Sequence, residues 1–244
     1  FLSPNKNLFL DEDSKQLKIA VIQPVKNDYK ILNNLTLQAK NNGAEVIIWP
    51  EAIGSYENFQ EKREFKDIDI IGGFFVQKDE KIFTSIVNTS TNERYDKRNL
   101  VPFGEFQPFD NLLKGFNEFF NIPNSSITRG EKSQKKILVQ EIPFSGLICW
   151  ELSFNDTFVD RTRNTAFIIH ISNDSWYGKN MPAQHLLHAK ARAIESQKWV
   201  VRSTTDGISK IIPPYGHEKL SDNIPKGIEG FKIETISTNM KNTT

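Results

Sequence analysis

Cysteine is nearly absent from this 244-residue chain, which has a single one at position 149. A lone thiol excludes a disulfide within the chain and leaves the redox compartment open. A surplus of charge is missing too, because 31 basic side chains are balanced by 30 acidic ones. Composition therefore gives no reason to expect nucleic acid or a strongly acidic partner.

Long hydrophobic runs are also missing. A membrane-spanning helix needs about 20 mostly apolar residues, whereas the apolar runs at 46–49 and 166–169 end after a few positions. No signal-peptide pattern and no glycine-rich phosphate loop are visible. His185 and His188 are three apart, but no carboxylate or third histidine stands near them at a zinc-like spacing. We expect no metal and no cofactor.

Strand-like and helix-like segments alternate along the chain, which indicates an α/β layered fold in one domain. The expected helices are 29–41 and 183–197, and the expected strands are 18–23, 45–49, 67–77, 82–91, 136–140, 146–149 and 167–171. We divide the chain into a linker at 1–16 that would leave a membrane region, a catalytic domain at 17–236 and a polar tail at 237–244.

Three residues at or near the ends of apolar or strand-like runs have the chemistry for acyl transfer. Cys149 ends a short apolar run, Glu51 follows another, and Lys97 opens a loop that contains proline and glycine. A thiol is mostly protonated at neutral pH, so it needs a base or a neighbouring cation to become a nucleophile. Glu51 can remove the proton, and Lys97 can stabilise first the thiolate and then an oxyanion, with backbone N–H groups near Cys149 as helpers.

Each of these residues also has a purely structural interpretation. An unpaired cysteine is more often a small buried apolar residue than a nucleophile. Glu51 alone would be the polar end of a strand, and Lys97 a solvated charge. Ser133 and Lys136 have the spacing of a Ser-Lys pair, but no supporting motif accompanies them. The co-occurrence of the three favours catalysis.

The amino-acid sequence of these segments resembles that of the carbon-nitrogen hydrolase (nitrilase) superfamily. Within it, the resemblance is to the nitrilase-like domain of the apolipoprotein N-acyltransferase family. The resemblance covers about residues 17–215 and rests on four motifs in order, namely Trp49-Pro-Glu51, Lys97 followed by Leu-Val-Pro-Phe-Gly-Glu105, Cys149-Trp-Glu151, and Asn173-Asp-Ser-Trp-Tyr-Gly178 with Gln184-His185 and Ala191-Arg-Ala-Ile-Glu195.

The resemblance implies the four-layer αββα sandwich of nitrilases and a role for each matching residue. Glu51, Lys97 and Cys149 match the catalytic base, the oxyanion-stabilising lysine and the nucleophile. Glu105 matches a second carboxylate that supports the lysine. The positions that match pocket and loop residues around the substrate are Trp150, Glu151, Asn173 and Trp176. Taken alone, Asn173 is equally typical of a turn, and Trp176 of a core.

The implied reaction moves a fatty acyl chain from a phospholipid, through a thioester on Cys149, to the N-terminal diacylglyceryl-cysteine amine of an apolipoprotein. The expected location is the bacterial inner membrane with this domain in the periplasm, or a soluble state if the chain exists alone. Two alternatives stay open, a soluble amidase that hydrolyses a small amide and an inactive orphan domain.

A phenylalanine-rich stretch at 106–122 follows Glu105 and has apolar residues spaced by three and four. This spacing predicts an amphipathic helix over about 110–120. Such a helix beside a lipid-using site would contact the membrane interface; the alternative is a helix packed on its own domain.

Overall fold

The computed structural model describes residues 15–101, 105, 127–178, 180–215 and 223–238. The longer elements in chain order are β1 (Gln16–Gln23), α1 (Tyr29–Asn41), β2 (Val46–Ile48), α2 (Tyr56–Glu61), β3 (Asp69–Lys78), β4 (Lys81–Asn88), β5 (Arg94–Asp96), β6 (Ile137–Val139), β7 (Ile142–Ile148), α4 (Asn155–Thr162), β8 (Phe167–Asn173), α5 (Met181–Ser196), β9 (Val200–Thr205), β10 (Lys210–Ile212) and β11 (Gly230–Ser237). Two short 3-10 helices, η2 (Cys149–Ser153) and η3 (Asp174–Trp176), follow β7 and β8.

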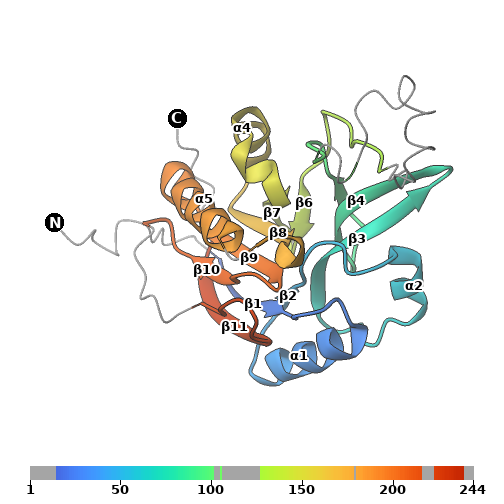
Figure 1. Cartoon of the computed structure of the whole chain (residues 1–244). Helices are drawn as coiled ribbons and strands as arrows, with labels where there is room; N and C mark the ends of the chain where they lie inside the picture. Colours follow the sequence, from blue (N-terminus) through green and yellow to red (C-terminus); the bar gives the residue numbers. More distant parts are fainter. Residues whose placement is uncertain (1–14, 102–104, 106–126, 179, 216–222, 239–244) are drawn as a thin grey trace.

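These elements form two sheets that face each other (Figure 1). One has six strands in the order β11-β1-β2-β3-β4-β5, and the other has five in the order β10-β9-β8-β7-β6. In each sheet the central strands are parallel, β1 with β2 and β3 in the first and β7 with β8 and β9 in the second. The carboxyl ends of parallel strands meet at one edge of a sheet, where ligand sites of α/β proteins form.

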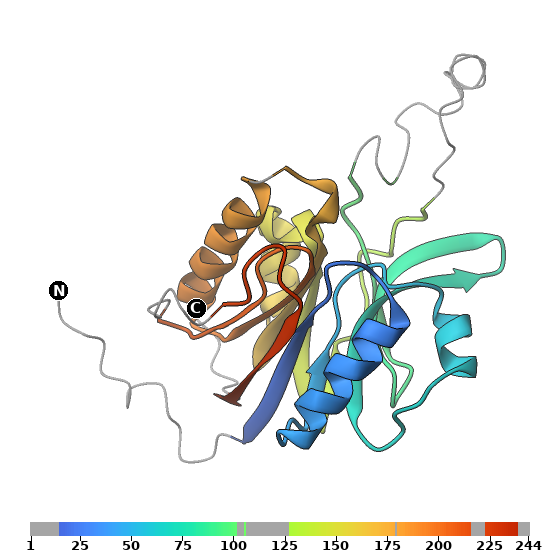
Figure 2. The same cartoon turned by 60° about the horizontal axis from the view of Figure 1, so that its bottom comes forward.

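Helices cover the outer face of each sheet. Helices α1 and α2 lie on the six-stranded sheet, and α4 and α5 on the five-stranded one (Figure 2). The arrangement is the four-layer αββα sandwich predicted for the chain. Asp28 caps α1 by accepting a hydrogen bond from Lys30 N at 2.7 Å, and Gly43 ends it with a φ of +83°, a conformation that favours glycine.

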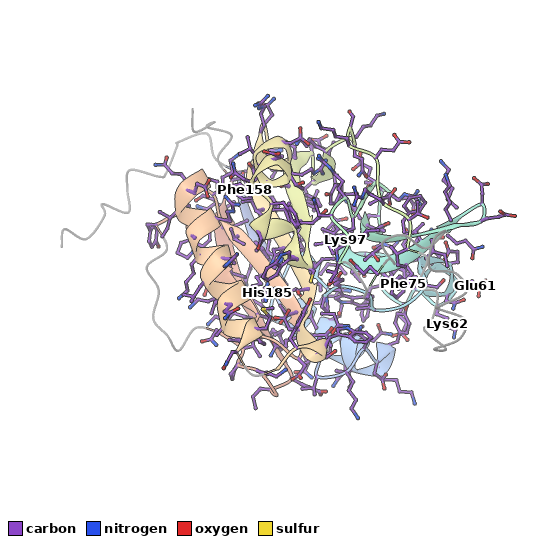
Figure 3. The ribbon with its side chains drawn as sticks, turned by 45° about the horizontal axis from the view of Figure 1, so that its top comes forward. Glu61, Lys62, Phe75, Lys97, Phe158 and His185 are labelled. Atoms are coloured by element: carbon purple, nitrogen blue, oxygen red, sulfur yellow. The ribbon has the colours of Figure 1, made fainter. Side chains whose placement is uncertain are left out.

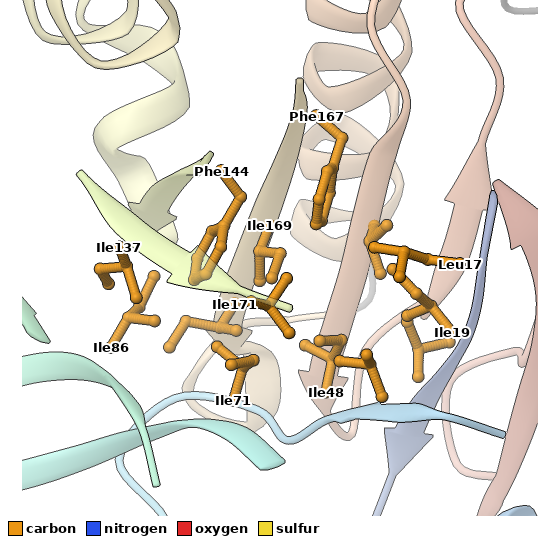
Figure 4. Packing of buried hydrophobic residues seen from close by; sticks show 14 of the residues in the cluster. Leu17, Ile19, Ile48, Ile71, Ile86, Ile137, Phe144, Phe167, Ile169 and Ile171 are labelled. Carbon is orange, nitrogen blue, oxygen red and sulfur yellow. The ribbon is translucent and has the colours of Figure 1, made fainter. Parts of the chain in front are cut away.

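The main core lies between the sheets. Its side chains come from alternate positions of facing strands, as in Ile19 and Ile48 on one side and Phe144 and Ile169 on the other (Figure 4). The intervening residues pack outward, Ile47 against α1 and α2, and similar residues of the second sheet against α4 and α5. Three apolar layers therefore hold the four layers of backbone together.

The predicted strands and both predicted helices are present, α1 over the predicted residues and α5 within two residues of its predicted ends. The sequence did not predict α2, α4, β5, β9, β10 or β11. The predicted helix at 106–122 lies outside the described residues, as do residues 1–14 of the predicted linker and 239–244 of the tail. None of the helices in the described ranges has the length and apolar character to cross a membrane.

Phe144 tests the core between the sheets. The Phe144→Ala variant should lose about 3–5 kcal/mol of unfolding free energy, because the ring is fully buried and stacks on Phe167 with 5.8 Å between centroids. Leu138→Ala on the neighbouring strand is the control, since Leu138 is 38% exposed and should change stability by less than about 0.5 kcal/mol. Equal losses in urea titrations of the two variants would contradict this account of the core.

Candidate active site

Residues from both sheets meet at one cavity of about 440 Å³. Glu51 lies a few residues after β2, Lys97 directly follows β5, and Cys149 directly follows β7. All three line the cavity, together with Glu105 and Asn173. The structure thus brings together the three residues predicted to carry the chemistry, although the first and the last are 98 positions apart in the sequence.

Lys97 lies between two carboxylates. Its Nζ donates to Glu51 Oε1 at 2.9 Å and to Glu105 Oε1 at 2.7 Å, and the lysine is 1% exposed. Burial alone would lower the pKa of Lys97, but the negative charges of Glu51 and Glu105 raise it above the ordinary value. The lysine is therefore a cation at neutral pH.

Glu51 is held from both sides. One carboxylate oxygen accepts from Lys97, and the other accepts from the backbone N–H of Asn173 at 3.0 Å. Burial raises the pKa of Glu51 above its ordinary value, against the opposing effect of the Lys97 cation. A carboxylate with a raised pKa is a better proton acceptor, which suits a general base.

Cys149 is the first residue of η2 and lies in a strained turn directly after β7. Its φ is +53°, in the left-handed region that residues with a side chain rarely adopt. Burial raises the pKa of its thiol to about 12, helped by the charge of Glu51 and opposed by that of Lys97. At neutral pH the thiol is therefore protonated, and it becomes a nucleophile only if a base takes its proton.

The sequence analysis missed Tyr177, although the residue stands within the motif at 173–178. Its hydroxyl lies 3.9 Å from Cys149 Sγ and it lines the cavity. Burial raises the pKa of Tyr177, as does the adjacent thiol of Cys149. Tyr177 is thus a neutral hydrogen-bonding group beside the sulfur.

Glu151 lies behind the cavity and not in its wall. The carboxylate is fully buried and accepts from Tyr95 Oη at 2.9 Å and from the backbone N–H groups of Arg98 at 2.7 Å, Asn99 at 3.1 Å and Ile148 at 3.0 Å. These donors flank Lys97 on one chain segment and Cys149 on the other. Glu151 therefore ties the two segments together beneath the site.

The two tryptophans predicted beside the substrate take different places. Trp150 packs against His185 and His188 of α5, with ring centroids 5.3 and 5.9 Å apart, and it does not line the cavity. Trp176 does line it and is 83% exposed. The two histidines bind separate partners, His185 an oxygen of Asp174 and His188 the hydroxyl of Ser153.

Most of the cavity wall is apolar. Besides the charged groups, its lining among the described residues includes Phe75, Val101, Ile127, Trp176 and Tyr177. Figure 3 shows Lys97 near the middle of the molecule, with Phe75 of β3 on one side of it and His185 of α5 on the other. The arrangement can activate a thiol and stabilise an anion next to an apolar group.

Comparison with known proteins finds relatives for most of the chain. The profile of the family described as carbon-nitrogen hydrolase matches residues 16–220. An apolipoprotein N-acyltransferase of Vibrio vulnificus is 32% identical over 247 residues, covering 88% of this chain and 48% of that protein. The chain thus spans about half the length of the curated relatives it matches.

Solved structures share the fold at low sequence identity. A glutamine-dependent NAD+ synthetase from Acinetobacter baumannii superposes with a TM-score of 0.68 at 18% identity, over 94% of this chain and 48% of that one. An amidase from Nesterenkonia gives a TM-score of 0.63 at 16% identity, over 91% of this chain and 90% of the amidase.

Alkylation of Cys149 by iodoacetamide tests the role of Glu51. The rate should fall as pH drops through the raised pKa of Glu51, because the protonated carboxyl cannot accept the thiol proton. Glu51→Gln should remove this acid limb and react at least about tenfold more slowly at pH 7. The loss is smaller than the usual general-base contribution of 10²–10⁴, since removing the Glu51 charge also lowers the thiol pKa. An unchanged rate and pH profile in Glu51→Gln would rule out the carboxylate as base.

Glu151→Gln tests the four hydrogen bonds by which Glu151 joins the segments of Lys97 and Cys149. The amide can neither carry the charge nor accept on both sides, so the variant should lose about 2–3 kcal/mol of unfolding free energy and also slow the alkylation of Cys149. Glu195→Gln is the control, because that carboxylate is half exposed and pairs with Arg192 at the surface; it should cost less than about 1 kcal/mol. Equal stability of the two variants in urea would show that the four donors to Glu151 matter little.

Proposed function

This chain belongs to the carbon-nitrogen hydrolase family, and on that premise we propose that it is an acyltransferase. The donor is a phospholipid, and the acceptor is the α-amino group of the N-terminal diacylglyceryl-cysteine of an apolipoprotein. One observation carries the proposal: a thiol, a base and a buried cation open onto a cavity whose remaining wall is mostly apolar. The relative from Vibrio vulnificus carries the name of this activity.

The first half of the reaction loads the enzyme. Glu51 takes the proton of Cys149, and the thiolate attacks the ester carbonyl of the phospholipid. Lys97 stabilises the resulting oxyanion, which costs no reorganisation because the ammonium is already held by two carboxylates. As the intermediate collapses, the glycerol oxygen leaves with the proton from Glu51. The products are a thioester on Cys149 and a lysophospholipid.

The second half transfers the chain. The neutral α-amine of the acceptor attacks the thioester carbonyl, and Glu51 accepts a proton from the nitrogen. The thiolate of Cys149 leaves and regains that proton, so the enzyme returns to its starting state. An α-amino group has a pKa of about 8, so a useful fraction is neutral at physiological pH and positioning supplies most of the remaining barrier reduction.

The cavity wall supports a lipid over a small amide as the donor. Phe75, Val101 and Ile127 offer apolar surface directly beside the charged groups. Trp176 lines the same cavity and is 83% exposed, so its ring adds apolar surface that a lipid chain can reach. Because the donor is a membrane lipid, we place the reaction at the bacterial inner membrane, with residues 17–236 as the catalytic domain on the periplasmic side.

The intact mass of the chain tests the donor half-reaction. After incubation with phospholipid in detergent micelles, the wild type should gain the mass of one acyl chain, because the thioester persists until an amine arrives. Cys149→Ala should gain nothing. Lys97→Met should load at least about 10²-fold more slowly, the usual loss when an oxyanion donor is removed.

A parallel incubation with a simple amide separates the alternatives. Ammonia release without a lipid adduct would replace the proposal with an amidase that uses the same three residues. If neither a lipid adduct nor ammonia forms, and the protein still unfolds cooperatively, turnover by the 244-residue chain is contradicted.

A further inference from the structure

The backbone carbonyl of Cys149 has a buried partner. His170 of β8 is fully buried, and its Nε2 lies 2.9 Å from Cys149 O. The contact reaches a residue with a strained left-handed backbone, since the φ of Cys149 is +53°. Such a conformation persists only where the surroundings hold it.

The hydrogen-bond pattern fixes which nitrogen of His170 carries the proton. Arg202 Nη1 lies 2.6 Å from His170 Nδ1. A guanidinium can only donate, so Nδ1 must accept and Nε2 must carry the hydrogen. Burial lowers the pKa of His170 well below its usual range, and the Arg202 cation lowers it further, so the ring is neutral. His170 therefore donates to the carbonyl of Cys149 in one defined tautomer.

Arg202, which binds His170, is itself held by further hydrogen bonds. Arg202 Nη2 donates to Asp174 Oδ2 at 2.7 Å, and its Nε donates to Ile208 O at 3.1 Å. Asp174 also accepts from Ser172 Oγ at 2.6 Å. Asp174, Arg202 and His170 are each fully buried. The three side chains form a charged and hydrogen-bonded support that ends on the backbone of the nucleophile.

Fixing this carbonyl also fixes the N–H on the other side of the same peptide. No peptide bond among the described residues is cis. In a trans peptide the C=O and N–H point in opposite directions, so the Trp150 N–H points away from His170. Trp150 is the second residue of η2, where backbone N–H groups have no acceptor within the helix. An N–H beside a nucleophile and free of helical bonding is available to an oxyanion.

We infer that His170, held by Arg202 and Asp174, is a positioning residue that aims the Trp150 N–H at the oxyanion formed on attack by Cys149. Lys97 Nζ supplies the other donor. The inference rests on the proposed acyl transfer and adds to it a device that acts only when an oxyanion forms. His170 itself neither gains nor loses a proton.

Two reactions of the same thiol separate this role from general support of the fold. Alkylation by iodoacetamide is displacement at a saturated carbon and forms no oxyanion. Acylation by a p-nitrophenyl ester passes through a tetrahedral oxyanion. His170→Leu should keep its alkylation rate within about twofold of the wild type, whereas the acylation rate should fall about 10- to 100-fold, somewhat less than for complete removal of an oxyanion donor.

Two further variants keep the test sharp. His170→Gln can accept from Arg202 and donate to Cys149 O, so it should recover acylation to within about fivefold of the wild type. His170→Ser leaves room for water around Arg202 and serves if His170→Leu does not fold; it should show the same selective loss. Lys198→Met is the control, because it removes a buried bond to a backbone carbonyl, Thr162 O at 2.6 Å, away from the cavity. Lys198→Met should leave the ratio of the acylation rate to the alkylation rate unchanged.

The outcomes are distinct. Parallel loss of both reactions in folded His170→Leu or His170→Ser, or no loss of acylation, overturns the positioning role. Acylation of the wild type by the aryl ester but not by phospholipid overturns the proposed donor and leaves the role of His170 standing. A wild type that takes an acyl group from neither probe overturns both.

Discussion

The buried ammonium of Lys97 is the charge on which the geometry of the site depends. A buried cation is costly unless it is paired and hydrogen-bonded, and here two carboxylates satisfy it. Glu51 reaches it from the loop after β2, and Glu105 from the loop after β5. Removing Lys97 would leave both carboxylates without their cation. The ion group therefore forces two loops to end at one point, and the cavity forms around that point.

The second sheet is joined to this ion group through Glu151 and Asn173. Glu151 accepts from the backbone N–H of Arg98, next to Lys97, and from that of Ile148, next to Cys149. At the end of β8, the Asn173 N–H donates to Glu51. Both contacts join a charged side chain to a backbone N–H, and such charge-assisted bonds are stronger than neutral ones. The apolar core between the sheets sets their separation, and these few polar bonds set the position of the reactive atoms.

Sequence reasoning found the strands with plain apolar patterns and the residues at their ends, because burial and strand termination are local signals. It did not find β9, since Arg202 and its polar neighbours make that strand look exposed, although Asp174 and His170 neutralise or bind the arginine in the interior. Glu151 was expected in the pocket because it matches a pocket position in the family that the sequence resembles. The left-handed turn at Cys149 instead places it in the interior, and such a turn follows from tertiary contacts that no local pattern encodes.

Burial of Cys149 has a further consequence, for the lifetime of the enzyme. Peroxides and disulfides react with thiolates far faster than with thiols. With a pKa of about 12, the resting sulfur is almost wholly protonated, and it is 5% exposed. The same burial that raises the thiol pKa thus keeps the resting sulfur in the form that peroxides oxidise slowly.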